Sequence, residues 1–426
     1  MRKFLRLLTH SLTSDTAKDT YLIFSGNIFT SFLAFLYTIF LARAFSPDNL
    51  GVFSSITAFI LLAGDVLDLG ITTSLSRFYP EIKRKEGEAH ADFFINNTFK
   101  FQLYISLAMV IFIIILSPFL SEILLQSASF SSLYVLAGIG VLTTVIAAFI
   151  SAALSAQKRF LPVVLVSSSS TLVKLLLVLL LFYSGRFSLE LVTASFVVAP
   201  LAAILLGLNF LRLSIIGDKF SLSLLKKLLS YSTFIAFARV FSAVSSRFDA
   251  LMLIPLSSTY EAGIYSAAYK IIFTYILLSG SFSMVIAPRL SSFPTIGKSI
   301  PYLKKVILGV FLILLTMVFM YIVAPVFVPF ILGDNYYQSI PVFRALLLPA
   351  ALFVSTIPSV NFLLYVAKKP QISAFNTIVS LLIIFFGNLY FIPHYGRLGP
   401  VFTLTLAYGF TVISSSLFTF YYLKHG

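Results

Sequence analysis

Long apolar runs, separated by short polar or basic breaks, fill most of this chain of 426 residues. Most runs contain roughly 20 residues or more, the length of an α-helix that crosses a hydrocarbon core about 30 Å thick, whereas membrane strands alternate over about ten residues. The pattern predicts an all-α integral membrane protein with about 12 transmembrane helices. They are expected near residues 21–43, 51–76, 97–117, 131–155, 161–183, 188–211, 229–254, 262–287, 305–326, 339–366, 371–391 and 398–422.

Composition indicates the same class. Hydrophobic residues make up 59% of the chain and charged residues 11%, and the mean hydropathy is +1.01. So few charges cannot coat a soluble globule, and lipid is the expected solvent. Residues 1–20 are basic and polar, and no short apolar core with a small-residue cleavage site precedes the first long run. No removable signal peptide is therefore expected, and the first span is retained.

Basic side chains gather on one side of the predicted membrane. When alternate loops are assigned to the side of the N-terminus, that side carries about 22 Lys and Arg residues and the other side roughly three. The positive-inside rule then places both termini in the cytoplasm and requires an even number of spans. The formal charge of +15 is an orientation signal, and no nucleic-acid partner is expected. The cytoplasmic set includes Arg2, Lys3, Arg6, Lys83, Arg84, Lys85, Lys226 and Lys227.

Several kinds of chemistry lack the residues that would perform them. The chain has no cysteine and its four histidines fall in predicted tails or loops, so no metal site, cofactor or catalytic residue is expected. The Gly-Lys-Ser at 297–299 lacks the earlier glycine of a phosphate-binding loop, because Ser292 stands there. An ion gradient, the membrane potential or the substrate's own gradient must drive any transport. No outer loop is long enough for a catalytic domain, which argues against an enzyme.

Landmarks recur along the chain at an offset of about 212 residues. The segment LGVFS at 50–54 falls on AGIYS at 262–266, and the second residue of each is Gly. The basic turn at 158–159 similarly falls on 368–369. The recurrence predicts two six-helix lobes of equal orientation around a central cavity, with coincidence among similar apolar segments as the alternative. The expected lobes are residues 1–214 and 215–426.

A few basic residues fall inside the predicted helices. A charge at membrane depth costs about 2.5–3.5 kcal/mol on the insertion scale, so such residues normally face a cavity or a partner. Because these cations outnumber the buried acids, and paired donors suit phosphate oxygens, the set predicts a basic cavity that binds an anion. Structural pairing or snorkelling is the alternative, and snorkelling explains Arg344 almost as well. The candidate substrate-binding residues are Arg239, Arg247, Lys270, Lys174 and Arg344.

Three acidic residues are also predicted within the membrane. Asp65 and Asp68 lie about one turn apart on one face of the helix expected at 51–76. Asp249 is two residues from Arg247 and so about 200° away around the helix, a poor placement for a direct ion pair. These three acids are the candidate ion-coupling residues, with Na⁺ or H⁺ as the coupling ion.

Two segments carry a resemblance to known membrane proteins. Residues 41–81 read LARAFSPDNLGVFSSITAFILLAGDVLDLGITTSLSRFYPE, and residues 245–271 read SSRFDALMLIPLSSTYEAGIYSAAYKI. The first resembles the opening of polysaccharide flippases of the Wzx type, in the multidrug/oligosaccharidyl-lipid/polysaccharide exporter superfamily. The second resembles the opening of their second half. The likeness covers the whole chain in length, span count and repeat.

The resemblance implies a V-shaped, MATE-like bundle in the inner (cell) membrane of a bacterium or archaeon. Such proteins move undecaprenyl-diphosphate-linked oligosaccharide from the cytoplasmic to the outer leaflet for surface polysaccharides such as O-antigen. The implied partners are this glycolipid, membrane lipid, and polysaccharide polymerase or assembly proteins. In the superfamily the first, second, seventh and eighth helices line the cavity, which brings forward Asp65, Asp68, Arg239, Arg247 and Lys270.

One departure and two alternatives accompany this expectation. Lipid II flippases carry an intramembrane Arg on the first helix, whereas here no cation precedes Arg43 at its outer end, which makes a peptidoglycan role less favoured. A MATE-type drug or metabolite antiporter is one alternative, although organic cations favour buried acids. A membrane enzyme acting on polyprenyl-phosphate sugars is the other, and it requires a long outer loop or an intramembrane cluster of acids and His.

Overall fold

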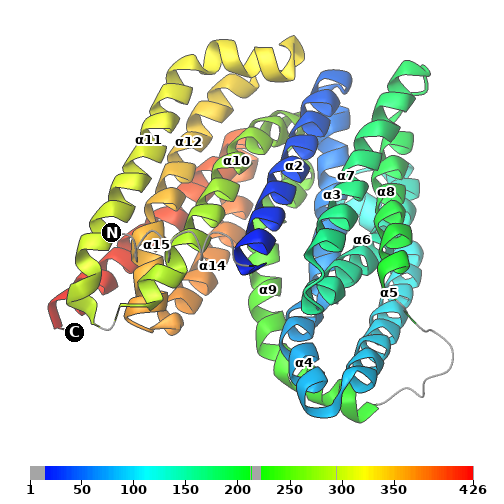
Figure 1. Cartoon of the computed structure of the whole chain (residues 1–426). Coiled ribbons are helices and arrows are strands. Elements are labelled where there is room, and N and C mark those ends of the chain that lie inside the picture. The colour runs from blue at the N-terminus through cyan, green and yellow to red at the C-terminus, as the bar shows by residue number, and fades with distance from the viewer. Residues whose placement is uncertain (1–14, 212, 214–221, 294, 426) are drawn as a thin grey trace. The chain divides into compact units, whose positions relative to one another are not determined.

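The structure is a computed structural model that describes residues 15–425 except 212, 214–221 and 294 (Figure 1). Every regular element among these residues is helical. The long helices are α2 (Asp15–Ala44), α3 (Pro47–Asp68), α4 (Ile71–Glu86), α5 (Glu88–Leu125), α6 (Ser131–Ala156), α7 (Phe160–Tyr183), α8 (Leu189–Phe210), α9 (Leu222–Leu256), α10 (Thr259–Ser291), α11 (Ile296–Leu332), α12 (Ser339–Ser355), α14 (Pro370–Tyr395) and α15 (Gly399–His425). The short elements are η1 (Ala128–Phe130), η2 (Asp334–Tyr336), α13 (Ile357–Asn361), η3 (Phe362–Val366) and η4 (Gly396–Leu398). The N-terminal residues Arg2, Lys3, Arg6 and His10 lie outside the described residues, as do the side chains of Lys226, Lys227 and His425.

Ten segments of the described chain are long and apolar enough to cross a membrane. One of them, Pro370–Lys424, contains both α14 and α15. The predicted class, an all-α integral membrane protein, is confirmed. The count of about twelve helices stays a prediction.

Two helices that the hydropathy pattern predicts as continuous are segmented. The segment expected at 51–76 lies within one candidate span, Pro47–Glu86, but its helix is not continuous, because α3 ends at Asp68 and α4 begins at Ile71. Leu69 and Gly70 between them adopt positive φ angles of 46° and 73°. The expected helix 339–366 divides into α12, α13 and the π-helical turn η3. Pro358 lies at this second break, where it has no amide hydrogen to continue the α-helical bonding.

The chain forms two compact units, which are described separately. Unit 1 comprises residues 1–38, 59–121 and 127–240, and unit 2 comprises residues 39–58, 122–126 and 241–426. Helices α2, α3, α5 and α9 therefore each contribute to both units. The lobe boundary expected at 214/215 stays a prediction.

In unit 1, α6 packs against α4, α7 and α8. The interior includes Phe99 and Phe149, whose ring centroids are 5.4 Å apart, and the buried Ile150. Gly207 of α8 allows close helix packing, since a Cβ there would lie 2.3 Å from a methyl carbon of Ile150. Small residues commonly allow such close approach between membrane helices, because lipid provides no hydrophobic drive for their association.

In unit 2, the starts of α3 and α10 cross at two glycines that the repeat makes equivalent. A Cβ on Gly51 would lie 2.1 Å from the carbonyl oxygen of Thr259, and a Cβ on Gly263 would lie 1.8 Å from that of Pro47. Pro47 and Thr259 are themselves one repeat offset apart, so the contact is reciprocal. This is the contact that two-fold symmetry between the repeats predicts.

The basic turns of the two repeats also share a backbone conformation. Lys158 and Lys368 have φ angles of 59° and 55°, in the left-handed region that residues other than Gly rarely occupy. Each is followed by the residue that precedes a helix, α7 in one case and α14 in the other. The structure thus adds two conformational likenesses to the sequence evidence for the repeat.

Candidate functional site

The break between α3 and α4 in unit 1 is organised by the side chain of Asp68. Its Oδ1 accepts a hydrogen bond from the backbone N–H of Thr72 at 3.2 Å, and its Oδ2 accepts one from the Thr72 hydroxyl at 3.0 Å. The first amides of a helix have no partner within the helix, so a carboxylate here satisfies one of them and favours the start of α4. The break therefore holds a charged acid in a defined position.

Arg239 of α9 pairs with this acid. Its Nη1 donates to Asp68 Oδ2 in an ion pair, and also to the Thr72 hydroxyl at 2.7 Å. The Asp68 side chain is 12% exposed and that of Arg239 is 43% exposed. Both bonds described for Arg239 use Nη1, and within the described part of the chain the Nη2 and Nε edge of the guanidinium has no hydrogen-bond acceptor.

Both residues line a cavity of about 340 Å³ in unit 1. Asp65, one turn earlier on α3, lines the same cavity, as its spacing from Asp68 predicts. Thr72 and Ser151 add hydroxyl groups, and the rest of the lining is mainly small or apolar. This cavity holds two carboxylates and one guanidinium, so the surplus of cations expected for the central cavity as a whole stays a prediction.

Lys174 lies elsewhere in unit 1, among aromatic rings. Its half-buried ammonium nitrogen is 4.0 Å from the ring centroid of Phe196 and 5.8 Å from that of Tyr37. No carboxylate of the described residues lies within ion-pair distance of it. Attraction to aromatic faces is the interaction that the structure provides for this charge.

The three remaining cations lie in unit 2 and do not line one described cavity. The Lys270 ammonium is 5.7 Å from the ring centroid of Phe53. Arg344 donates from Nε to the backbone oxygen of Tyr321 at 3.0 Å, and its guanidinium lies 5.0 Å from the Tyr321 ring centroid. These contacts pair Arg344 with Tyr321 of α11, and its role stays a prediction. Arg247 is half-buried on α9. The predicted basic shell draws on both units and stays a prediction.

Asp249 is buried in unit 2 and bonded to a tyrosine. It accepts a hydrogen bond from the Tyr265 hydroxyl and one from the backbone N–H of Ala250 at 3.1 Å. The Tyr265 ring stacks on that of Tyr269, with centroids 5.6 Å apart and planes at 19°. The sequence predicted that Arg247 is a poor partner for Asp249, but it did not predict the tyrosine. The role of Asp249 in ion coupling stays a prediction.

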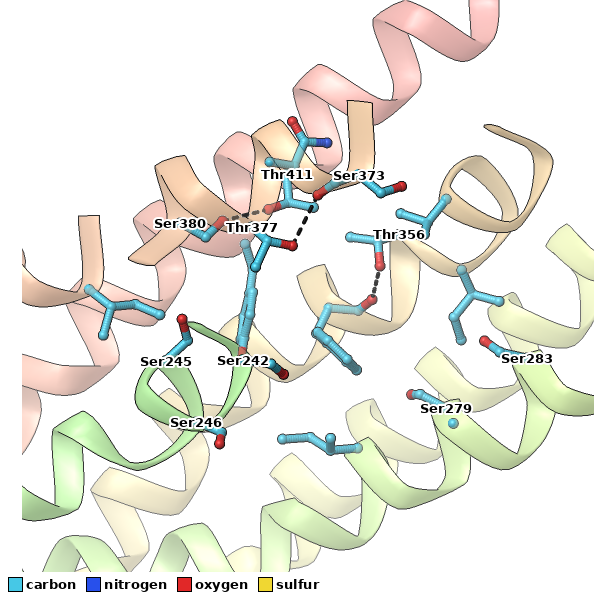
Figure 2. Close-up of a pocket in the computed structure, with 18 of the residues that line it drawn as sticks. Ser242, Ser245, Ser246, Ser279, Ser283, Thr356, Ser373, Thr377, Ser380 and Thr411 are labelled. Atoms are coloured by element: carbon cyan, nitrogen blue, oxygen red, sulfur yellow. Dashed lines mark hydrogen bonds between the residues drawn. The ribbon is translucent and has the colours of Figure 1, made fainter. Parts of the chain in front are cut away.

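Unit 2 also contains a neutral polar pocket that sequence reasoning missed. Its cavity of about 500 Å³ lies among α9, α10, α12, α13, α14 and α15, and Figure 2 shows Ser and Thr side chains around it. Of the 21 lining residues, 14 are Ser, Thr, Tyr or Asn, and none of those described is charged. The serine-rich segments 242–246 and 279–283 could have indicated this polar pocket from the sequence. We call this cavity the hydroxyl pocket.

Helical spans, an internal repeat and polar cavities within the bundle define a polytopic membrane protein with a transporter fold. The family described as "Polysaccharide biosynthesis protein" matches residues 16–294, well over half of the chain, and the chain belongs to this family. No curated protein matches the chain.

Solved structures support the fold. The chain is similar to "Lipid II flippase MurJ, inward closed conformation", with a TM-score of 0.72 and 16% identity over 93% of this chain and 87% of that one. It is also similar to an inward-facing multidrug resistance MATE family transporter of the MOP superfamily, with a TM-score of 0.69 and 15% identity over 93% and 96%. The chain is also similar to a MOP superfamily transporter from Pyrococcus furiosus that is described as having a binding pocket of reverse polarity, with a TM-score of 0.65 and 13% identity over 97% of this chain and 98% of that one.

Proposed function

We propose that the protein is a flippase that moves undecaprenyl-diphosphate-linked oligosaccharide from the cytoplasmic to the outer leaflet. Membership of the polysaccharide biosynthesis family and a fold shared with a lipid flippase support this proposal. The basic loops support an orientation with both termini in the cytoplasm of a bacterial or archaeal cell. The proposed activity is transport and not catalysis, with polysaccharide polymerase or assembly proteins as partners.

The position of Arg239 is the observation that carries the proposal. Its guanidinium is partly exposed at a cavity, and Asp68 and Thr72 hold it through one nitrogen only. The remaining edge of the fork can donate two parallel hydrogen bonds to a phosphate group, a geometry that lysine does not offer. A diphosphate would thus share Arg239 with Asp68, while Lys174, Arg247, Lys270 and Arg344 stay further candidates.

We propose that coupling to an ion acts through the same pair. A proton on Asp68, or Na⁺ at Asp65 and Asp68, would weaken the hold of the carboxylate on Arg239 and release the guanidinium to the diphosphate. With a cytoplasm-negative potential, each uncompensated negative charge moved outward gains about 2.3 kcal/mol per 100 mV. Asp249 is a second coupling candidate, although its bonds to Tyr265 and Ala250 hold it in a more buried place.

The test uses cells that lack their own copy of the transporter. Arg239→Gln is expected to abolish surface polysaccharide, while protein abundance stays near normal because the side chain is partly exposed. Arg84→Gln is the matched control, since it removes the same charge from the exposed end of α4. Normal polysaccharide in the Arg239 variant would sink the assignment of a diphosphate site there.

One observation favours a second candidate, a MATE-type antiporter of organic cations. The cavity in unit 1 contains two acids, Asp65 and Asp68, and buried acids suit a cationic cargo. This alternative predicts that Asp65→Asn raises the sensitivity of cells to a cationic dye such as ethidium and leaves surface polysaccharide intact. The flippase proposal predicts that the same variant loses surface polysaccharide and that its sensitivity to the dye does not change.

A further inference from the structure

The hydroxyl pocket of unit 2 has a lining whose chemistry selects its ligand. The 14 polar lining residues carry hydroxyl or amide groups, and the described lining contains no acid and no base. A charged group transferred into such a site finds no countercharge among the lining residues, which costs much more than transfer of a neutral group. Most of the surface that the lining presents is apolar, so the ligand must also offer C–H faces, as a sugar ring does. The pocket therefore favours a neutral ligand with many hydroxyl groups.

Half of the twelve Ser, Thr and Tyr hydroxyls of the pocket donate their hydrogen to a backbone oxygen three or four residues earlier. Ser245 donates to the backbone oxygen of Phe241 at 2.8 Å, and Thr377 donates to that of Ser373 at 3.0 Å. The dashed line between Thr377 and Ser373 in Figure 2 marks the second of these bonds. Since each oxygen keeps its lone pairs, the pocket presents a set of acceptors with fixed positions. A ligand must bring donors, as sugar hydroxyls do.

Other groups of the pocket supply donors. The Ser373 hydroxyl oxygen is buried and has no hydrogen-bond partner in the described part of the chain. Ser373 also lies beside Thr377 in Figure 2, so both are presented to the same cavity. A buried hydroxyl without a partner costs about 1–3 kcal/mol. Rotation of the Ser373 side chain to another rotamer would bring this hydroxyl to a ligand oxygen and remove that penalty.

Two tyrosines complete the site. Tyr408 of α15 packs its ring at 5.1 Å from that of Phe353, and Tyr269 is held by its stack on Tyr265. Both line the pocket. Aromatic faces pack against the C–H face of a sugar ring, and a tyrosine hydroxyl adds a hydrogen bond at its rim. A platform of this kind is absent from the described lining of the charged cavity in unit 1.

We propose that the hydroxyl pocket binds an uncharged sugar unit of the transported glycan, through Thr377, Ser373 and Tyr408, and discriminates against sugars that carry a carboxylate. This inference rests on the proposed flippase function, and it assigns the diphosphate and the glycan to separate sites. The volume of about 500 Å³ lies within the range of roughly 300–1,000 Å³ that small-molecule sites occupy.

The experiment measures sugar binding to the full chain in lipid nanodiscs by saturation-transfer NMR. The probes are cellobiose and cellobiouronic acid, which differ only in the replacement of one CH₂OH group by a carboxylate. Cellobiose is expected to give a saturation signal, and the acid a signal at least roughly fivefold weaker. In the Thr377→Val and Tyr408→Phe variants, loss of one hydrogen bond of about 1 kcal/mol weakens cellobiose binding by roughly fivefold.

The matched control is Thr405→Val on α15. Thr405 donates to the backbone oxygen of Val401 at 2.7 Å, in the same way as Thr377 donates to that of Ser373, but it does not line the pocket. Unchanged cellobiose binding in this variant supports the site. Equal binding of the two probes, or equal cellobiose binding in all variants, overturns it, as does the absence of cellobiose binding in the wild type, which leaves a pocket filled by water.

A parallel measurement separates this inference from the proposed function. Binding of undecaprenyl diphosphate without a glycan is followed by native mass spectrometry in the wild type, Arg239→Gln and Thr377→Val proteins. Lipid binding that depends on Arg239, together with no cellobiose binding, overturns the sugar pocket alone. The reverse outcome is cellobiose binding that depends on Thr377 and lipid binding that is equal in the wild type and Arg239→Gln proteins. It overturns the diphosphate site and supports the sugar pocket.

Discussion

The cavity of unit 1 and the hydroxyl pocket of unit 2 differ in charge, although α3 at the first and α10 at the second are equivalent in the predicted repeat. The first cavity lies at the break between α3 and α4 and contains two carboxylates and one guanidinium. The second is neutral in its described lining and lies beside α10, which is continuous from Thr259 to Ser291. At the offset of 212 residues, Asp68 falls on Gly280, which lines the neutral pocket.

This difference shows that a change at very few sequence positions can convert a charged cavity into a neutral one. The acid that pairs with Arg239 and stabilises the start of α4 has no counterpart in the second repeat, where the equivalent helix does not break. Replacing one Asp by Gly removes both the charge and the acceptor for the first amides of a new helix. In the proposed account, the cavity of unit 1 thus recognises a charged head group and the hydroxyl pocket recognises a neutral glycan.

The largest expected effect is a loss of stability when a side chain is added at the crossing of α3 and α10. Gly263→Ala places a Cβ where the Pro47 carbonyl oxygen would be 1.8 Å away, and neither backbone can move without separating α3 from α10. We expect a loss of about 3 kcal/mol in stability, seen as a lower melting temperature in detergent.

Gly51→Ala tests the reciprocity of this contact and is expected to behave similarly, since its Cβ would meet the Thr259 oxygen at 2.1 Å. Gly280→Ala is the control, because a Cβ there has no atom within 4 Å. A melting temperature equal to that of the wild type in both crossing variants would break the comparison of the two repeats.

The next effect comes from transferring the acid of one cavity to the other. Gly280→Asp introduces a carboxylate at the repeat-equivalent position of Asp68, where the described lining provides no cation. We expect transport of a neutral glycan, measured as surface polysaccharide, to fall by roughly tenfold or more, because the charge retains its water and opposes entry of the sugar.

Gly280→Asn is the matched neutral variant of nearly the same shape, and it should keep more than half of the wild-type polysaccharide. If the Asn and Asp variants are impaired equally, the neutrality of the pocket has no functional importance, and bulk alone explains the result.

The smallest effect separates two roles of Asp68. Asp68→Asn keeps an oxygen for the Thr72 amide but loses the charge that holds Arg239, whereas Asp68→Ala loses both. We expect the Ala variant to be less stable than the Asn variant by about 1 kcal/mol, the usual contribution of a helix cap. Chemical unfolding in mild detergent measures the difference, and equal stability of the two variants would remove the capping role.

Much of the fold could be predicted from the sequence, because hydropathy and spacing report local structure. The helix ranges, the repeat and the shared face of Asp65 and Asp68 follow from periods along the chain. The break at Leu69 and Gly70 was not predicted, since the residues on both sides continue the apolar pattern of a single span. Left-handed backbone at Leu69 leaves no mark in hydropathy.

The site was harder to predict, because its partners are distant in sequence. Asp68 and Arg239 are 171 residues apart, and no local period relates them. The hydroxyl pocket was missed for another reason. Ser and Thr are common within membrane helices, where they bond to their own backbone as Thr377 does, so their convergence around one cavity becomes visible only in three dimensions.

The central claim is that Arg239 receives the diphosphate of a lipid-linked oligosaccharide during flipping. Its most direct test is transport of undecaprenyl-diphosphate-linked oligosaccharide across the bilayer of proteoliposomes that contain the purified chain, followed by lectin access to the outer leaflet. The wild type and Arg84→Gln proteins are predicted to move the glycolipid at equal rates, and Arg239→Gln at the rate of empty liposomes. Equal rates in all three proteins would contradict the account.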